Sequence, residues 1–204
     1  MKKKKLIIFD LDGVLIDSVS NMELALKKTS LALNVDLRFS LYKKFLGLPF
    51  EKIMKKMGIN KNIQKIKKTY SFFSKKNISK IKIKKKHLSQ LKTLRKNYDF
   101  AVFTSKDRIR TNMILKKYRF FKHIISSDDV KKGKPNKEGI NKILKNLKVQ
   151  KNDCLYVGDS FYDYKAAKNS KVKYLHAKWG YEKNLSKKYS IKEISNLGSI
   201  KKFL

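Results

Sequence analysis

The chain has 204 residues, enough for one domain or for one domain with an insert. Its 52 basic and 16 acidic residues give a formal charge of +36. Few of the basic residues are arginine, the side chain that best recognises phosphate. Because A/T-rich codons specify lysine, we attribute the charge to codon composition rather than to nucleic-acid binding. The single cysteine, Cys154, excludes an internal disulfide, and no apolar stretch approaches membrane-spanning length, so we expect a cytoplasmic protein.

The first part of the chain shows one strand followed by a helical block. Residues 6–9 are all apolar and read as a buried strand, too short for a signal peptide. From about 18 to 80 the apolar residues recur at helical spacing, and no strand pattern is found. Pro49 suits the start of a helix and Gly58 suits its end. We expect helices over 19–33, 39–46, 50–57 and 61–75.

The second part alternates between helices and strands. Helices are expected over 86–97, 108–117, 136–147 and 161–169, and strands over 100–103, 123–126, 154–157 and 172–176. Such alternation is typical of a parallel sheet with right-handed crossovers, which the first strand would join. We therefore predict an α/β fold with a Rossmann-like core of three layers and a mainly parallel sheet. The helical block is an insert after the first strand.

Polar side chains follow the expected strands at the point where each one ends. In open parallel sheets, ligands bind at the carboxyl ends of the strands, so these side chains should meet at one edge of the sheet. The residues concerned are Asp10, Asp12, Thr104, Ser105, Lys134, Asp159, Ser160 and Asp163.

This set of side chains suits phosphoryl chemistry. Asp10 and Asp159 offer hard oxygen ligands, which favour Mg²⁺, and no Cys/His cluster argues for zinc. Hydroxyls and a lysine can hold and neutralise a phosphoryl group. A carboxylate beside Mg²⁺ can act as a nucleophile and form an aspartyl-phosphate. A second carboxylate, Asp12, can protonate the leaving oxygen and later activate water.

Four motifs occur in order: DLDGVLIDS at 10–18, FAVFTS at 100–105, GKPNK at 133–137 and GDSFYD at 158–163. On these motifs the chain resembles, over residues 6–170, the haloacid dehalogenase superfamily of phosphatases, and within it the phosphoglycolate phosphatase and β-phosphoglucomutase-like group. This group carries an α-helical cap where the present chain has its insert. Lys137 departs from the proline that many members have. The WGY segment at 179–181 resembles a loop near the active site.

The resemblance implies a role for each motif residue. Asp10 is the expected nucleophile, and Asp12 is the expected general acid and base. Thr104, Ser105 and Lys134 are expected to bind the phosphoryl group. The expected metal ligands are Asp10, Asp159 and Asp12, the last through its backbone carbonyl, and Asp163 is expected to support the metal site or Lys134.

The sequence therefore predicts a Mg²⁺-dependent phosphatase of a small phosphorylated metabolite. Residues 1–16 and 84–204 would form the catalytic core, and residues 17–83 the cap. The alternatives are a phosphosugar mutase and, from another class, a non-catalytic basic protein that binds a polyanion. We expect no membrane or nucleic-acid partner, and a monomer or homodimer. Phosphoglycolate, a sugar phosphate, a sialic-acid-type phosphate and a nucleotide monophosphate all remain open as substrates.

Overall fold

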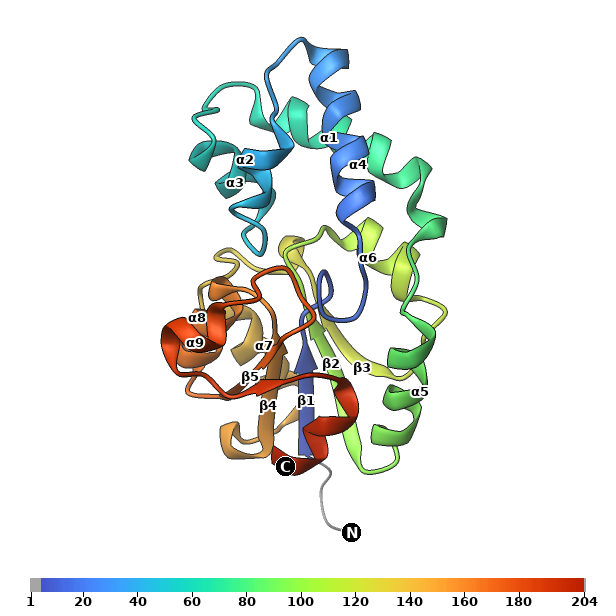
Figure 1. The fold of residues 1–204 in the computed structure, drawn as a ribbon, viewed down its shortest axis with the longest axis vertical. Coiled ribbons are helices and arrows are strands. Elements are labelled where there is room, and N and C mark those ends of the chain that lie inside the picture. Colours follow the sequence, from blue (N-terminus) through green and yellow to red (C-terminus); the bar gives the residue numbers. More distant parts are fainter. Residues whose placement is uncertain (1–4, 204) are drawn as a thin grey trace.

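The computed structural model describes residues 5–203 and is built around one sheet of six strands, all of them parallel. The order across the sheet is β3-β2-β1-β4-β5-β6. Figure 1 shows β1 near the middle of the sheet, with the strands ending below a separate group of helices. The expected parallel α/β core is confirmed. The strands are β1 (Lys5–Phe9), β2 (Tyr98–Phe103), β3 (Phe121–Ile125), β4 (Cys154–Gly158), β5 (Lys173–Ala177) and β6 (Glu193–Ile194).

Strand β1 is apolar throughout its length because both of its faces are buried. Side chains alternate between the two faces of a strand, so Leu6 and Ile8 pack on one side of the sheet and Ile7 and Phe9 on the other. All four are completely inaccessible to solvent. The strand therefore fixes the position of the residue that follows it, Asp10.

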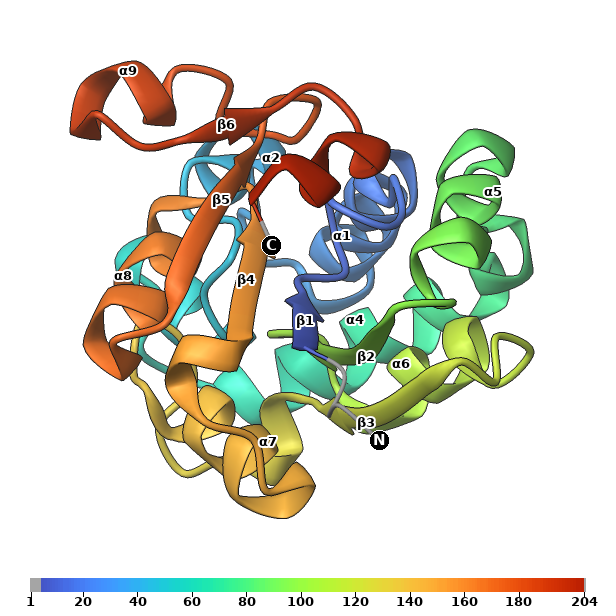
Figure 2. The same cartoon turned by 90° about the horizontal axis from the view of Figure 1, so that it is seen from below.

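Helices cover both faces of the sheet, as Figure 2 shows from below. On one face, α7 (Glu138–Leu147) and α8 (Phe161–Ser170) pack against Leu6, Ile8 and the buried thiol Cys154. On the other face lie α5 (Lys85–Leu94), α6 (Arg108–Leu115) and the 3₁₀ turns at Leu197–Phe203. The result is the expected three-layer core.

The insert between β1 and β2 is helical and lies over the carboxyl ends of the strands (Figure 1). It has its own apolar core, in which Leu26 from α1 and Tyr70 from α4 are buried. Its helices are α1 (Val19–Leu33), α2 (Phe39–Lys43), α3 (Phe50–Lys56) and α4 (Ile63–Lys76).

The two linkers of the insert run side by side. Ile16 and Ile83 form an antiparallel bridge, and the indole of Trp179 donates a hydrogen bond of 3.0 Å to the carbonyl of Val14. We propose on this basis that 17–83 is a cap domain and that 1–16 with 84–204 is the core. Of this division, residues 1–4 and 204 lie outside the described part of the chain.

Several local expectations differ from the structure; for example, the helix expected over 86–97 ends at Leu94. The helix expected over 39–46 ends at Lys43, and turns lead on to Gly47, whose φ of 97° strongly favours glycine. The helix expected over 136–147 begins at Glu138, because the side chain of Asn136 accepts a hydrogen bond from the Glu138 amide. Helix α9 (Leu185–Tyr189) and the two-residue strand β6 were not expected. No helix in 5–203 is both long and apolar enough to cross a bilayer.

Candidate active site

A small cavity lies between the carboxyl ends of the strands and the insert. Its volume is about 150 Å³. The core contributes Asp10, Asp12 and Thr104 to its wall, and the insert contributes residues from α1 to α4, among them Tyr42 and Tyr70. The polar residues that follow the strands therefore do meet at one edge of the sheet.

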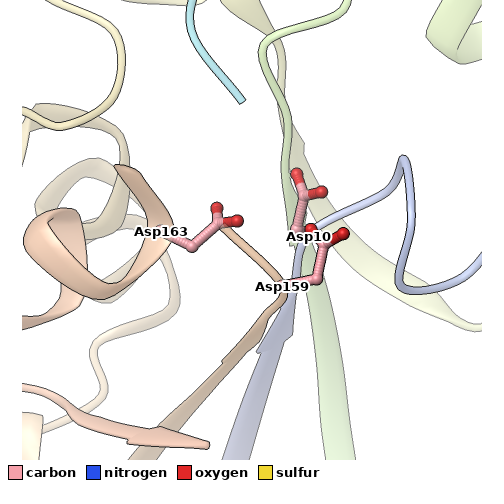
Figure 3. Close-up of side chains that lie close together, drawn as sticks. All are labelled: Asp10, Asp159 and Asp163. Atoms are coloured by element: carbon pink, nitrogen blue, oxygen red, sulfur yellow. The ribbon is translucent and has the colours of Figure 1, made fainter. Parts of the chain in front are cut away.

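Three carboxylates gather at the floor of this region (Figure 3). Asp10 follows β1, Asp159 follows β4, and Asp163 lies in the first turn of α8. One oxygen atom from each lies within 4.8 Å of the others, and all three side chains are buried. Buried carboxylates this close repel one another unless a cation lies among them.

Lys134 supplies one such cation. Its ammonium group bonds to Oδ1 of Asp10 and, at 2.6 Å, to Oδ1 of Asp163, and the side chain is completely buried. Burial alone would lower the pKa of Lys134, but the two carboxylates outweigh burial and raise it. Lys134 is therefore charged at any ordinary pH.

The three carboxylates differ in what they contact. Asp163 accepts hydrogen bonds from Ser160 and Tyr156 in addition to Lys134, and although burial works the other way, these contacts lower its pKa. Burial raises the pKa of Asp10 to about 7, against the opposing effect of Lys134. The pKa of Asp159 is also raised, first by burial and then by Asp10 and Asp163.

Asp10 and Asp159 therefore form the part of the cluster that a bound cation would stabilise. Both are hard oxygen donors, and no His or Cys joins them among the described residues. The donor set fits a divalent cation such as Mg²⁺ and does not resemble a zinc site. Asp163 pairs with Lys134, and its expected support of the metal site or of Lys134 stays a prediction.

The loop after β1 packs closely against the side chain of Asp159. Gly13 has a φ of 88°, and a Cβ atom there would lie 2.1 Å from Oδ2 of Asp159, so the glycine of the first motif is needed for this close approach. The backbone amide of Tyr181 donates to the same oxygen at 2.6 Å. The WGY segment at 179–181 thus lies at the site, as the sequence indicated.

Asp12 lies apart from the carboxylate cluster. Its Oδ1 accepts a hydrogen bond from the hydroxyl of Ser18 and lies 3.0 Å from Nζ of Lys106. Its carboxylate faces the cavity, whereas Lys106 is nearly buried. Two donors therefore fix the carboxylate in a defined orientation. Metal binding by the backbone carbonyl of Asp12, which the sequence analysis expects, stays a prediction.

Thr104 and Ser105 both line the cavity, but their hydroxyls have different partners. The hydroxyl oxygen of Thr104 accepts a bond of 3.1 Å from the amide of Lys106. The hydroxyl of Ser105 donates to the carbonyl of Gly47 in the insert at 2.6 Å. Ser105 therefore links the core to the insert in this arrangement.

Several residues of the site were not found from the sequence. Lys106 directly follows the TS of the second motif, and its position three residues beyond the end of β2 was a signal that could have identified it. The aromatic and basic residues from the insert and from α6 carry no such signal, because folding alone brings them here. They are Tyr42, Lys43, Lys44, Tyr70 and Arg110.

The parallel sheet, the helical insert after β1 and the buried carboxylates beside a lysine define an α/β protein with a cluster of aspartates that could hold a metal ion. The model of one family, the haloacid dehalogenase-like hydrolases, matches residues 7–177. The chain belongs to this family.

Individual relatives agree with this assignment. Pyrophosphatase PpaX of Anoxybacillus flavithermus is 36% identical over 87 residues, which is 41% of this chain and 40% of that protein. The chain thus matches well under half of the length of this relative. A predicted phosphoglycolate phosphatase from Haemophilus somnus superposes with a TM-score of 0.81 at 20% identity, covering 100% of this chain and 99% of the other. CbbY from Rhodobacter sphaeroides in complex with phosphate superposes with a TM-score of 0.82 at 17% identity. The match covers 97% of this chain and 96% of the CbbY chain.

Proposed function

We propose that the protein is a Mg²⁺-dependent phosphatase that hydrolyses a small phosphorylated metabolite through an aspartyl-phosphate. The observation that carries the proposal is the bond of the buried Lys134 to Oδ1 of Asp10, beside Asp159. This contact leaves Oδ2 of Asp10 to form a bond to phosphorus while the ester bond breaks. The names of the PpaX and phosphoglycolate phosphatase relatives, and the phosphate bound in CbbY, support the same class of reaction.

The proton transfers are assigned to Asp12. It lies two residues after Asp10, lines the same cavity, and is held by Ser18 and Lys106. Asp12 gives a proton to the leaving oxygen, then removes one from the water that attacks the phosphoaspartate and releases inorganic phosphate. Because Lys106 and Ser18 hold Oδ1, they orient the carboxyl group for both steps.

The remaining residues neutralise and hold the phosphoryl group. Lys134 offsets negative charge on Asp10, and Thr104 and Ser105 are assigned to the phosphoryl oxygens. Mg²⁺ held by Asp10 and Asp159, with the Asp12 carbonyl, would supply further charge neutralisation. Phosphoryl transfer depends mostly on such positioning and charge stabilisation.

The experiment is release of inorganic phosphate from a panel of phosphorylated metabolites, with Mg²⁺ and with EDTA. We expect release from one or a few compounds with Mg²⁺ and none with EDTA. Release that is equal in both conditions would contradict the proposed metal dependence. No release from any compound would contradict the phosphatase proposal and favour the mutase or the polyanion-binding alternative, which a phosphosugar isomerisation assay and salt-dependent retention on a nucleic-acid column separate.

A second prediction concerns stability, pH and Mg²⁺. Asp10 has a folded-state pKa of about 7 against an ordinary value of 3.8, so its contribution to stability is full below about pH 4 and is lost as the pH rises through 7. The difference between these two pKa values corresponds to roughly 4 kcal/mol in the free energy of unfolding. We expect Mg²⁺ to raise the melting temperature of the wild type more at pH 8 than at pH 5, because only the ionised site binds the cation.

The control for this prediction is Asp10→Asn. Burial lowers the pKa of His87, His123 and His176, so the histidines favour stability at higher pH and oppose the effect of Asp10. The difference between the wild type and Asp10→Asn isolates the carboxyl group. A melting-temperature difference that does not change between pH 5 and pH 8 would show that Asp10 has no raised pKa.

A further inference from the structure

The segment 179–181, which follows β5, packs against the loop after β1 and against Asp159. The indole of Trp179 donates a hydrogen bond of 3.0 Å to the carbonyl of Val14 in that loop. A Cβ atom at Gly180 would lie 2.1 Å from Cβ of Asp159, so the backbone of the segment touches this residue directly. The segment therefore has a defined position beside the proposed metal site.

Tyr181 makes one bond with its backbone and another with its side chain, toward two different parts of the site. Its amide donates to Oδ2 of Asp159 at 2.6 Å, and its hydroxyl oxygen accepts a bond of 3.2 Å from the amide of Ser18. The side chain also lines the cavity. Burial and the negative charge of Asp12 raise the pKa of Tyr181, so its hydroxyl remains uncharged. The proposed chemistry assigns no part to this hydroxyl.

Ser18 uses its hydroxyl for Asp12 rather than for the helix that it begins. It stands at the N-cap of α1, where a serine side chain usually accepts a bond from an amide of the first turn. Within residues 5–203 the Ser18 side chain accepts no such bond, and its hydroxyl donates to Oδ1 of Asp12 instead. A contact that holds the Ser18 backbone therefore acts on the direction of this hydroxyl, and so on Asp12.

We propose that Tyr181 is a positioning residue that sets the place of Asp12 relative to Asp159. The inference rests on the proposed function, in which Asp12 transfers protons and Asp159 holds the cation. The Tyr181 hydroxyl fixes the amide of Ser18, whose own hydroxyl directs Asp12, while the Tyr181 amide ties the same residue to Asp159. A general acid acts only within hydrogen-bond reach of the leaving oxygen, so a small displacement of Asp12 slows the proton transfer.

The test compares Tyr181→Phe with the wild type by kcat/KM on two compounds: the best substrate of the panel and 4-nitrophenyl phosphate. The ratio kcat/KM reports formation of the phosphoaspartate, in which the leaving oxygen takes its proton from Asp12, whereas 4-nitrophenolate leaves as a stable anion and needs no proton. We expect kcat/KM to fall about fivefold or more for the first compound and less than about twofold for the second. The dissociation constant of Mg²⁺, measured by calorimetry, should stay within about twofold, because the Tyr181 amide is unchanged.

Ser18→Ala tests the connection through which Tyr181 acts. It removes the hydroxyl that reaches Asp12 and should give the same difference between the two compounds, which keeps the inference testable if Tyr181→Phe does not fold. Because Tyr181 acts through Ser18, the two losses should not add. We therefore expect Tyr181→Phe to change kcat/KM less than about twofold when it is introduced into Ser18→Ala.

The matched control is Tyr118→Phe. The hydroxyl of Tyr118 accepts a bond of the same length, 3.2 Å, from the amide of Ile83 at the other linker of the insert. Among residues 5–203, Tyr118 is not part of the cavity lining. Tyr118→Phe should therefore change kcat/KM less than about twofold on both compounds, whereas a purely structural effect of losing such a bond would appear in both tyrosine variants.

Three results would overturn the inference: equal losses of kcat/KM on the two compounds in Tyr181→Phe, the same losses in Tyr118→Phe, or losses that add in the double variant. The proposed function is judged separately, by Mg²⁺-dependent phosphate release from the wild type. An active wild type that Tyr181→Phe matches on both compounds retains the proposed function and removes only the positioning role of Tyr181. An inactive wild type removes both.

Discussion

Lys134→Met will lower the free energy of unfolding by about 3–5 kcal/mol at pH 8 in the absence of divalent cations. The variant keeps most of the side-chain volume but leaves the buried carboxylates of Asp10 and Asp163 without their shared cation. Urea denaturation measures the loss. At pH 5 the loss will be smaller, because carboxyl groups that lack the lysine bind protons more readily. Phosphate release will be lost as well.

The matched control is Lys142→Met, which removes an exposed lysine that pairs with Glu138 at 3.1 Å on α7. Exposed pairs of this kind contribute little, so the change should stay within about 0.5 kcal/mol. A loss below about 1 kcal/mol for Lys134→Met would show that Lys134 is not required to neutralise the carboxylate cluster.

Asp10→Asn will reduce phosphate release by a factor of about a thousand or more. An amide oxygen is a poor nucleophile, and no other side chain can replace the bond that Asp10 forms to phosphorus. The measurement is the rate of phosphate release at saturating Mg²⁺ on the best substrate of the panel. Circular dichroism on the same samples shows whether the fold is retained.

Asp17→Asn provides the control within the same motif. Asp17 is exposed and accepts a hydrogen bond from the amide of Val19 at the start of α1. This substitution should change the rate less than about twofold, since Asp17 lies outside the carboxylate cluster. Equal losses in the two variants, or more than a tenth of wild-type activity in Asp10→Asn, would argue against Asp10 as the nucleophile.

The core could be predicted because its signals are local. Residues 6–9 are apolar on both faces of a strand, and the abrupt change to Asp10 marks the end of that strand. The same change occurs between Phe103 and Thr104. Because parallel strands end at one edge of the sheet, the position of each strand end was enough to bring these polar residues together.

The rest of the site depends on contacts between distant segments. Arg110 reaches the cavity because Asp107 and Ser74 hold its guanidinium, and Ser74 belongs to the insert. The contact with Asp107 is local, because the two residues are three positions apart, but the contact with Ser74 joins distant segments and leaves no sequence pattern. The two residues of β6 are equally hard to predict, since such a short strand shows no alternation and forms only because β5 offers it an edge.

The bridge between Ile16 and Ile83 has a consequence for how this chain can change over time. Because the insert leaves and re-enters the core at adjacent points, its length and sequence can vary without moving β1 or β2. The groups that we propose act on the phosphoryl group, such as Asp10 and Thr104, directly follow strands of the sheet, whereas Tyr42 and Tyr70 lie in the insert. Changes in the insert can therefore alter substrate choice without altering the reaction. Exchange of the segment between Ile16 and Ile83 for that of a relative would transfer the substrate preference and leave the chemistry unchanged.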